Sequence, residues 1–116
     1  MAAVVTEGDV RRAALALPAT TEGPSYGTTG FRVKDRLFAR LRPEGDLLVV
    51  WTAEKEALMA SEPEKFTSTP HYDGHPTVLV RMGAVDAEEL AELLTESWRL
   101  RAPTRLLASF DAGELA

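Results

Sequence analysis

The chain has no cysteine among its 116 residues. Disulfide bonds, thiolate catalysis and cysteine-ligated zinc or iron–sulfur centres are therefore excluded. The absence of cysteine fits a reducing compartment, and we expect a cytoplasmic protein. Long apolar runs are also missing: none approaches the ~18 residues that a membrane-spanning helix needs, and the first residues lack the pattern of a secretory signal. We therefore expect no membrane partner.

Basic residues are fewer than acidic residues. The sequence has 13 lysines and arginines against 18 aspartates and glutamates, which gives a net charge of −5. A negative net charge argues against a general nucleic-acid coat protein, although it permits a local basic patch. Hydrophobic residues make up 45% of the chain and charged residues 27%, as in ordinary globular proteins. The length suits one domain, which we predict over residues 1–116.

Two segments carry complete start and stop signals for a helix. Each begins with a capping box, in which the first residue and the residue three positions later exchange hydrogen bonds with the backbone. Each then has apolar residues at helical spacing and ends at a proline. The capping pairs are Thr6 with Asp9 and Asp86 with Glu89, and the prolines are Pro18 and Pro103. A shorter helix is predicted at residues 53–61, with Thr52 as its cap.

Five segments are rich in β-prone residues, and we predict a strand at each of them. Residues 18–28, rich in proline, glycine and small polar residues, are predicted as a loop. The single residue Asp35 and the Asp73-Gly74 pair predict two hairpin turns, and Pro70 predicts an edge strand. The predicted strands are residues 29–34, 36–42, 47–52, 66–72 and 77–83.

The predicted order of elements is α-β-β-β-α-β-β-α. Short links between consecutive strands make those pairs antiparallel. Helices on one face of an antiparallel sheet give a two-layer α+β domain. Trp51 and Trp98, at a strand and a helix, are predicted to anchor its core.

Five basic residues lie within residues 31–42 and are opposed there only by Asp35. Strand alternation allows all five to project from one face of the sheet, with Phe38 among them. A basic ribbon with an aromatic ring can lie along phosphates or enter a groove of a nucleic acid. The alternative is a solvated face, because an open sheet face needs polar residues in any case. The candidate nucleic-acid-binding residues of this basic hairpin are Arg32, Lys34, Arg36, Arg40 and Arg42.

A family resemblance begins at Leu17-Pro18, where the first predicted helix ends. An acid follows, and then Ser-Tyr-Gly-Thr, Phe-x-Val and Phe-Ala-Arg; the matching residues are Glu22, Ser25, Tyr26, Gly27, Thr28, Phe31, Val33, Phe38, Ala39 and Arg40. Later matches are the runs TPHYDG and VLVRM, and Trp98 with Ala102-Pro103. Together these residues resemble the MmcQ/YjbR-like family of small bacterial proteins. Where many members of that family have His-Trp after the late turn, this chain has His75-Pro76.

The resemblance implies both a fold and a function. The fold it implies is a two-layer α/β domain similar to that of secretion chaperones. The function it implies is DNA binding, through the family's similarity to a double-wing domain of a phage transcription factor.

The loops of the family pattern contain several polar residues that a ligand could contact. His71, Asp73 and His75 alternate, but the predicted turn breaks the alignment that a metal site needs, so we predict no metal and no cofactor. No paired carboxylates and no Ser-His-Asp order stand out, so we predict no catalytic residue. The candidate ligand-pocket residues are Glu22, Ser25, Tyr26, His71, Tyr72 and Asp73.

Two functions of different classes follow from these observations. The first is binding of nucleic acid, DNA foremost, through the basic hairpin. The second is binding of a protein partner or a small ligand, at the sheet edge near Pro70 or at the loop pocket, by a monomer or a homodimer. An enzyme is the least supported alternative, since it needs Glu22, Tyr26, His71 and Asp73 to converge on one ligand.

Overall fold

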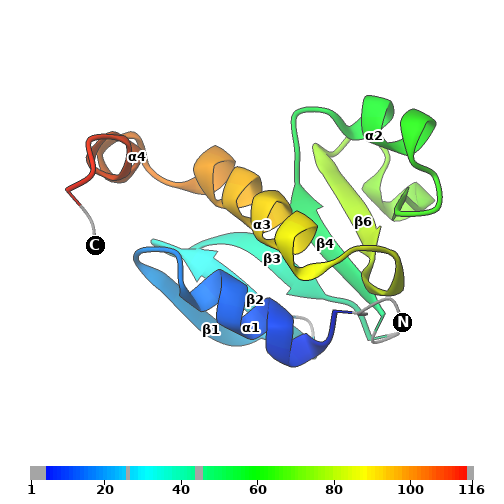
Figure 1. The fold of residues 1–116 in the computed structure, drawn as a ribbon, viewed down its shortest axis with the longest axis horizontal. Helices are drawn as coiled ribbons and strands as arrows, with labels where there is room; N and C mark the ends of the chain where they lie inside the picture. The colour runs from blue at the N-terminus through cyan, green and yellow to red at the C-terminus, as the bar shows by residue number, and fades with distance from the viewer. Residues whose placement is uncertain (1–4, 26, 44–45, 115–116) are drawn as a thin grey trace.

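The computed structural model describes residues 5–25, 27–43 and 46–114, and within them it contains a six-stranded sheet and four α-helices (Figure 1). The strands are β1 (Thr20–Ser25), β2 (Thr28–Val33), β3 (Arg36–Leu41), β4 (Leu47–Trp51), β5 (Phe66–Thr67) and β6 (Thr77–Arg81). The helices are α1 (Glu7–Leu15), α2 (Lys55–Ser61), α3 (Ala87–Arg101) and α4 (Thr104–Asp111), and two 3-10 turns are η1 (Pro70–Tyr72) and η2 (Met82–Ala84).

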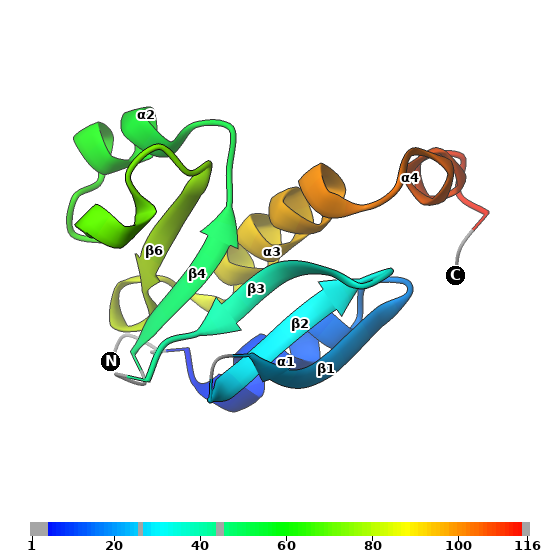
Figure 2. The same cartoon turned by 180° about the vertical axis from the view of Figure 1, so that it is seen from behind.

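The strands lie in the order β1-β2-β3-β4-β6-β5, and each pair of neighbours is antiparallel. Helices α1 and α3 cover one face of the sheet, and Figure 2 shows the opposite face with both helices behind it. We call that opposite face the open face. Helix α2 lies beside the β5–β6 edge, and α4 lies beyond the end of α3 (Figure 1). The predicted two-layer α+β arrangement is confirmed, with α2 and α4 outside the helix layer.

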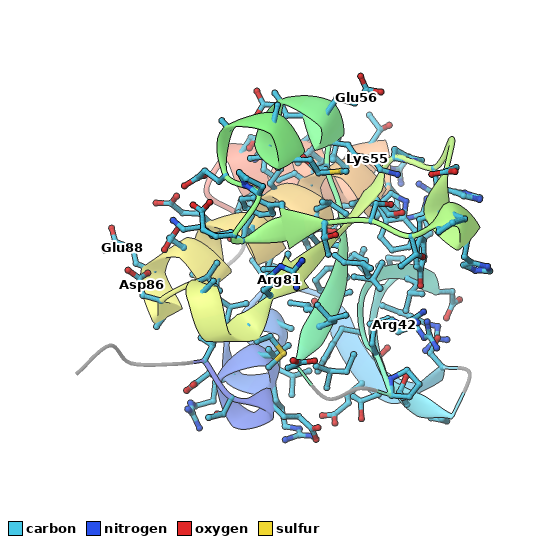
Figure 3. The ribbon with its side chains drawn as sticks, turned by 90° about the vertical axis from the view of Figure 1, so that its right-hand side faces the viewer. Arg42, Lys55, Glu56, Arg81, Asp86 and Glu88 are labelled. Carbon is cyan, nitrogen blue, oxygen red and sulfur yellow. The ribbon has the colours of Figure 1, made fainter. Side chains whose placement is uncertain are left out.

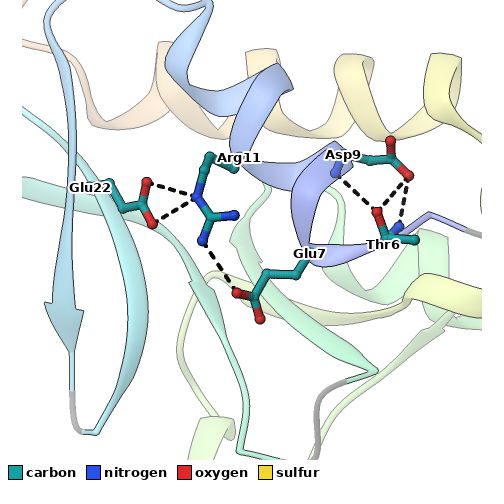
Figure 4. Close-up of polar contacts among 5 residues, drawn as sticks. All are labelled: Thr6, Glu7, Asp9, Arg11 and Glu22. Carbon is teal, nitrogen blue, oxygen red and sulfur yellow. Dashed lines mark hydrogen bonds and ion pairs between the residues drawn. The ribbon is translucent and has the colours of Figure 1, made fainter.

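Both predicted capping boxes are present. In α1, the Thr6 N–H donates to the Asp9 carboxylate (2.8 Å) and the Asp9 N–H donates to the Thr6 hydroxyl (3.2 Å), as Figure 4 shows. These bonds to Thr6 lower the pKa of Asp9 below its usual range. Asp86 and Glu89 make the same exchange at the start of α3. The predicted cap of α2 is wrong: Glu54 occupies that position, and the Thr52 hydroxyl instead accepts a hydrogen bond from the Glu54 N–H (3.1 Å).

Strand β1 corrects the predicted loop at residues 18–28. Its six residues pair with all six of β2, from Thr20 opposite Val33 to Ser25 opposite Thr28. Pro24, which has no N–H to donate, is tolerated because β1 is the edge strand. Composition predicted a loop, whereas the partner strand supplied the hydrogen bonds that made this segment a strand.

The basic hairpin is confirmed as β2 and β3, with a tight turn between them. Lys34 and Asp35 have φ angles of 48° and 70°, the left-handed conformation that a two-residue hairpin turn requires. The register then shifts: Phe31 pairs with Ala39, but the next residue, Arg32, pairs with Leu37.

Because of this bulge, β3 carries one extra residue, Phe38, which is fully buried in the core. The prediction that Phe38 lies among the arginines is therefore wrong, since strand alternation fails at a bulge.

The segment predicted as a strand over residues 66–72 pairs with β6 at Phe66 and Thr67, and then turns into η1 at Pro70. Proline cannot continue a ladder that needs its N–H, but it suits the first position of a helical turn. The edge position is confirmed, as is the antiparallel pairing with β6. Gly74 has a φ of 79°, as the Asp73-Gly74 signal predicts, although the link to β6 is longer than a two-residue turn.

The core lies between the sheet and the α1–α3 layer. Trp98 is fully buried there, as predicted, and its indole N–H donates to the carbonyl of Pro18 (3.0 Å). Phe110 of α4 packs against Trp98, with the ring centroids 4.8 Å apart and the ring planes inclined by 55°. The largest other side chains of this core that are less than 2% exposed are Phe31, Phe38, Leu48, Leu90 and Leu94.

Strands β3 and β4 separate at one end, and a side chain from α3 occupies the gap. Their ladder ends at the pair Ala39–Val50. One residue further, the buried hydroxyl of Ser97 donates to the carbonyl of Phe38 (2.5 Å) and accepts from the N–H of Trp51 (2.8 Å). One hydroxyl thus replaces a strand-to-strand hydrogen bond and ties the helix to both strands.

We expect Ser97→Ala to lower the free energy of unfolding by about 1–3 kcal/mol, because it leaves the Phe38 carbonyl and the Trp51 N–H without this partner. Urea unfolding followed by circular dichroism measures the change. Thr95→Ala, on the same helix, is the matched control, and we expect it to have little effect. A loss below about 0.5 kcal/mol for Ser97→Ala would show that the two strands can close the gap themselves.

Candidate functional site

The open face holds a cavity of about 800 Å³, within the range of small-molecule sites. Its floor is formed by β3, β4 and β6, one wall by the segment around η1, and one end by the last residue of α3. None of the described residues that line it is acidic. We call it the basic pocket; its lining residues are Leu37, Arg40, Arg42, Val49, Trp51, His71, Tyr72, His75, Pro76, Thr77 and Arg101.

Arg40 and Arg42 meet at Tyr72. One guanidinium nitrogen of each donates to the phenol oxygen, at 3.3 Å from Arg40 and 3.2 Å from Arg42. Arg40 also donates to the carbonyl of Ser25 (3.3 Å), and Arg42 lies 5.8 Å from the centre of the Tyr72 ring. Figure 3 shows Arg42 on the opposite side of the sheet from Asp86, at the start of α3. These contacts hold two guanidinium groups side by side on the wall of the pocket.

Arg101 reaches the same pocket from the helix layer. Beyond the gap occupied by Ser97, its Nε donates to the carbonyl of Leu37 (2.9 Å). Its guanidinium lies 4.6 Å from the centre of the Trp51 ring. Burial lowers the pKa of Arg101, and the charge of nearby Arg36 lowers it further. An anion bound beside Arg101 would offset both the burial of its guanidinium group and the repulsion from Arg36.

The wall formed by η1 is held by the ammonium group of a half-buried lysine. Lys55, at the start of α2, donates to the backbone carbonyls of Tyr72 (2.7 Å) and His75 (3.1 Å). The Lys55 side chain therefore fixes the segment that brings Tyr72 and both histidines to the pocket, without lining the pocket itself.

One of the lining residues, Thr77, has a buried hydroxyl with no hydrogen-bond partner among the described residues. Thr77 is 4% exposed, and its Oγ1 makes no hydrogen bond with any described residue. It stands opposite Trp51 across the β4–β6 ladder, so the hydroxyl-bearing residue and the indole are neighbours on the pocket floor. Buried polar atoms are nearly always hydrogen-bonded, so this unsatisfied hydroxyl is an exception at the edge of the cavity.

The predicted nucleic-acid-binding residues divide into two groups. Arg40 and Arg42 line the basic pocket. Arg32 contacts the carbonyl of Pro24 (3.4 Å), and the exposed Lys34 lies in the hairpin turn. Arg36 donates to the carbonyl of Arg101 (3.2 Å), at the end of α3.

The predicted ligand-pocket residues are only partly brought together. His71 and Tyr72 line the basic pocket, whereas Asp73 lines a neighbouring hollow beside α2. Ser25 contributes its carbonyl to Arg40, and its own hydroxyl is buried against Gly30. Tyr26 lies outside the described residues.

Glu22 is not part of the basic pocket. It forms an ion pair with Arg11 of α1, with a closest distance of 2.9 Å, as Figure 4 shows. This pair raises the pKa of Arg11. The predicted grouping of Glu22 with the residues of the late hairpin is therefore wrong: Glu22 is paired with Phe31, which faces the core, so its side chain extends toward the helix layer.

Seven of the residues that line the pocket were not predicted as site residues: Leu37, Val49, Trp51, His75, Pro76, Thr77 and Arg101. Trp51 was predicted to lie in the core, but it is half-buried on the open face. Alternation within β4 offers a signal for this position, since Leu48 and Val50 belong to the core cluster and Val49 and Trp51 do not. No sequence signal relates Arg101 to β4, because they are joined only through the packing of α3.

Among the described residues, no group of three or more histidine, aspartate or glutamate side chains is placed to hold a metal ion. No helix in the described ranges has the length and apolar character needed to cross a membrane.

A family model described as YjbR matches residues 15–100, most of the chain and all six strands. The chain belongs to the YjbR family. Relatives include the uncharacterized proteins Rv2570 of Mycobacterium tuberculosis and Mb2600 of Mycobacterium bovis, each 42% identical over 73 residues. The match covers 60% of this chain and 57% of each relative, so it spans little more than half of their length.

A solved structure supports the same assignment. The crystal structure of protein DR2400 from Deinococcus radiodurans, described as a DUF419 domain, superposes with a TM-score of 0.69 at 26% identity. The superposition covers 82% of this YjbR-family chain and 77% of that protein. The family and the α+β fold expected from the sequence are therefore both confirmed.

We expect Thr77→Val to leave the free energy of unfolding unchanged or to raise it by up to about 1 kcal/mol. Valine has nearly the same shape and removes a buried hydroxyl that no described residue satisfies. Thermal unfolding of both proteins in a buffer free of phosphate measures the effect. A loss above 1 kcal/mol would mean that the Thr77 hydroxyl has a structural partner in the free protein.

Proposed function

We propose that this YjbR-family protein binds an anionic ligand in the basic pocket of its open face. The observation that carries this proposal is the convergence of three guanidinium groups from two layers of the fold on one cavity. Arg40 and Arg42 come from the β3 hairpin and Arg101 from the end of α3, and all three line the same hollow.

Charge supports an anion rather than a neutral ligand. Three of the residues that line the pocket are arginines, whose guanidinium groups are positively charged at all ordinary pH values. Guanidinium groups present planar forks of donors that match carboxylate and phosphate oxygens, and they lose little rotational freedom when they are already held. The bonds of Arg40 and Arg42 to Tyr72 hold them in this way.

We expect Arg40→Gln and Arg42→Gln each to weaken anion binding about tenfold, since a charge-assisted hydrogen bond contributes about 1.5 kcal/mol or more. Titration with inorganic phosphate and with pyrophosphate, followed by amide chemical shifts, measures the affinity. The shifts are expected at the ends of β3 and β6 and in residues 70–76.

Arg81→Gln is the matched control, because Arg81 is exposed on β6 and does not line the pocket. Its affinity for both anions should equal that of the natural chain. Equal affinity in the Arg40→Gln/Arg42→Gln double variant, or no response to either anion, would refute the proposal.

Nucleic acid is a second candidate ligand. The observation that favours it is that Arg32 and the exposed Lys34 lie along the same hairpin as Arg40 and Arg42. Such a track could follow a phosphate backbone beyond the pocket, and the resemblance noted above implies DNA binding.

If the hairpin binds DNA, fluorescence anisotropy of a labelled duplex should fall steeply with rising salt, because phosphate contacts release counterions. The double variant Arg32→Gln/Lys34→Gln should reduce the salt slope by about two, one for each lost contact. The Arg40→Gln/Arg42→Gln variant shows whether the pocket arginines contribute to DNA binding in addition to Arg32 and Lys34. An unchanged slope in both double variants, or no binding at low salt, would leave small anions as the only ligands.

A further inference from the structure

The basic pocket has two chemically different ends. Arg40, Arg42 and Tyr72 form a cationic end, where two guanidinium groups share one phenol oxygen. The other end combines Trp51, the Arg101 guanidinium stacked on its ring at 4.6 Å, and the Thr77 hydroxyl. A simple inorganic anion would use the first end and leave the second without a role.

The two ends are separated along the strands. Arg40 is opposite Val49 in the ladder, and Trp51 stands two residues further along β4, or ~7 Å in an extended strand. Val49 lies between them on the pocket floor. A ligand that contacts both ends is therefore elongated, with its anionic group and its second binding group joined by a spacer.

The second end suits a flat ring with polar edges. Indole and guanidinium groups are the side chains on which nucleobases and similar rings stack. The Thr77 hydroxyl beside them is buried and has no described protein partner, so a rotation about χ1 that turns it toward the pocket would let it donate to or accept from a ring edge without breaking a bond. Tyr72 adds a second aromatic ring on the wall, in edge contact with His71 at 4.8 Å.

We propose that the basic pocket binds a nucleotide, with a phosphate at Arg40 and Arg42 and the base at Trp51, Arg101 and Thr77. A nucleotide has a phosphate, a flat polar ring and a pentose spacer between them, which are the three features that the pocket requires. The proposal rests on the proposed anion binding and specifies the ligand class of that same site. The bound nucleotide is either a free mononucleotide or one unpaired nucleotide of a single strand.

The test is calorimetric titration of the full chain with the four ribonucleoside monophosphates, the four nucleosides and inorganic phosphate. At least one monophosphate should bind at least about tenfold more tightly than inorganic phosphate does, and at least about tenfold more tightly than the corresponding nucleoside does. Thr77→Val should weaken that monophosphate about tenfold and leave the affinity for phosphate unchanged. Binding should also quench the fluorescence of Trp51 but not of the buried Trp98, so the quenching disappears in Trp51→Phe.

The outcomes separate this proposal from the proposed function. If phosphate binds through Arg40 and Arg42 but no monophosphate binds more tightly, or if Thr77→Val has no effect, the nucleotide is refuted and anion binding stands. If neither phosphate nor any nucleotide binds, both proposals fail. Because Thr77→Val is expected to fold, a loss of affinity in that variant reports on the ligand and not on stability.

A second titration identifies the source of the nucleotide. A four-residue single strand of the preferred base is compared with its monophosphate and with a duplex of the same sequence. Tighter binding of the single strand, with the same loss in Thr77→Val, assigns the nucleotide to a strand, and equal binding assigns it to a free mononucleotide. If the duplex and the single strand bind equally tightly and Thr77→Val changes neither affinity, the assignment of the nucleotide to the basic pocket is overturned.

Discussion

The hydroxyl of Ser97 is the contact on which the architecture of the open face depends. By bonding to Phe38 and Trp51 at once, it keeps β3 and β4 apart where their ladder would otherwise continue. The carbonyl of Leu37 is thereby available to Arg101, and a residue of the helix layer reaches a cavity on the other side of the sheet. A single buried hydrogen-bonding group thus couples the core packing of α3 to the composition of the pocket.

The distribution of charge explains how an acidic chain contains a basic pocket. Many cations away from the pocket are paired locally: Arg11 with Glu22, Lys65 with Glu62 and Glu89, and Arg99 with Asp111. The carboxylates at the start of α3 lie on the side of the sheet opposite the pocket, near the positive end of the helix dipole (Figure 3). The three arginines that line the pocket therefore lie on the other side of the sheet from these carboxylates.

Local signals predicted most of the fold. The capping boxes at Thr6 and Asp86 and the turn at Lys34 and Asp35 depend on bonds and dihedral angles within a few residues, and each is present. The errors fall where a distant partner decides. β1 is a strand because β2 pairs with it, and Phe38 enters the core because a bulge changes its direction.

The sequence by itself determined the family, the α+β class, the boundaries of the main helices and the concentration of arginine in one hairpin. Each of these depends on the types and spacing of residues that are close together in the chain. Only the tertiary structure decided which of these arginines share a site. Arg40 and Arg42 share a pocket with Arg101, far along the chain, because α3 packs across β3 and β4, while Glu22 forms an ion pair with Arg11. The convergence of charges from two layers is set by packing between elements, which no local pattern encodes.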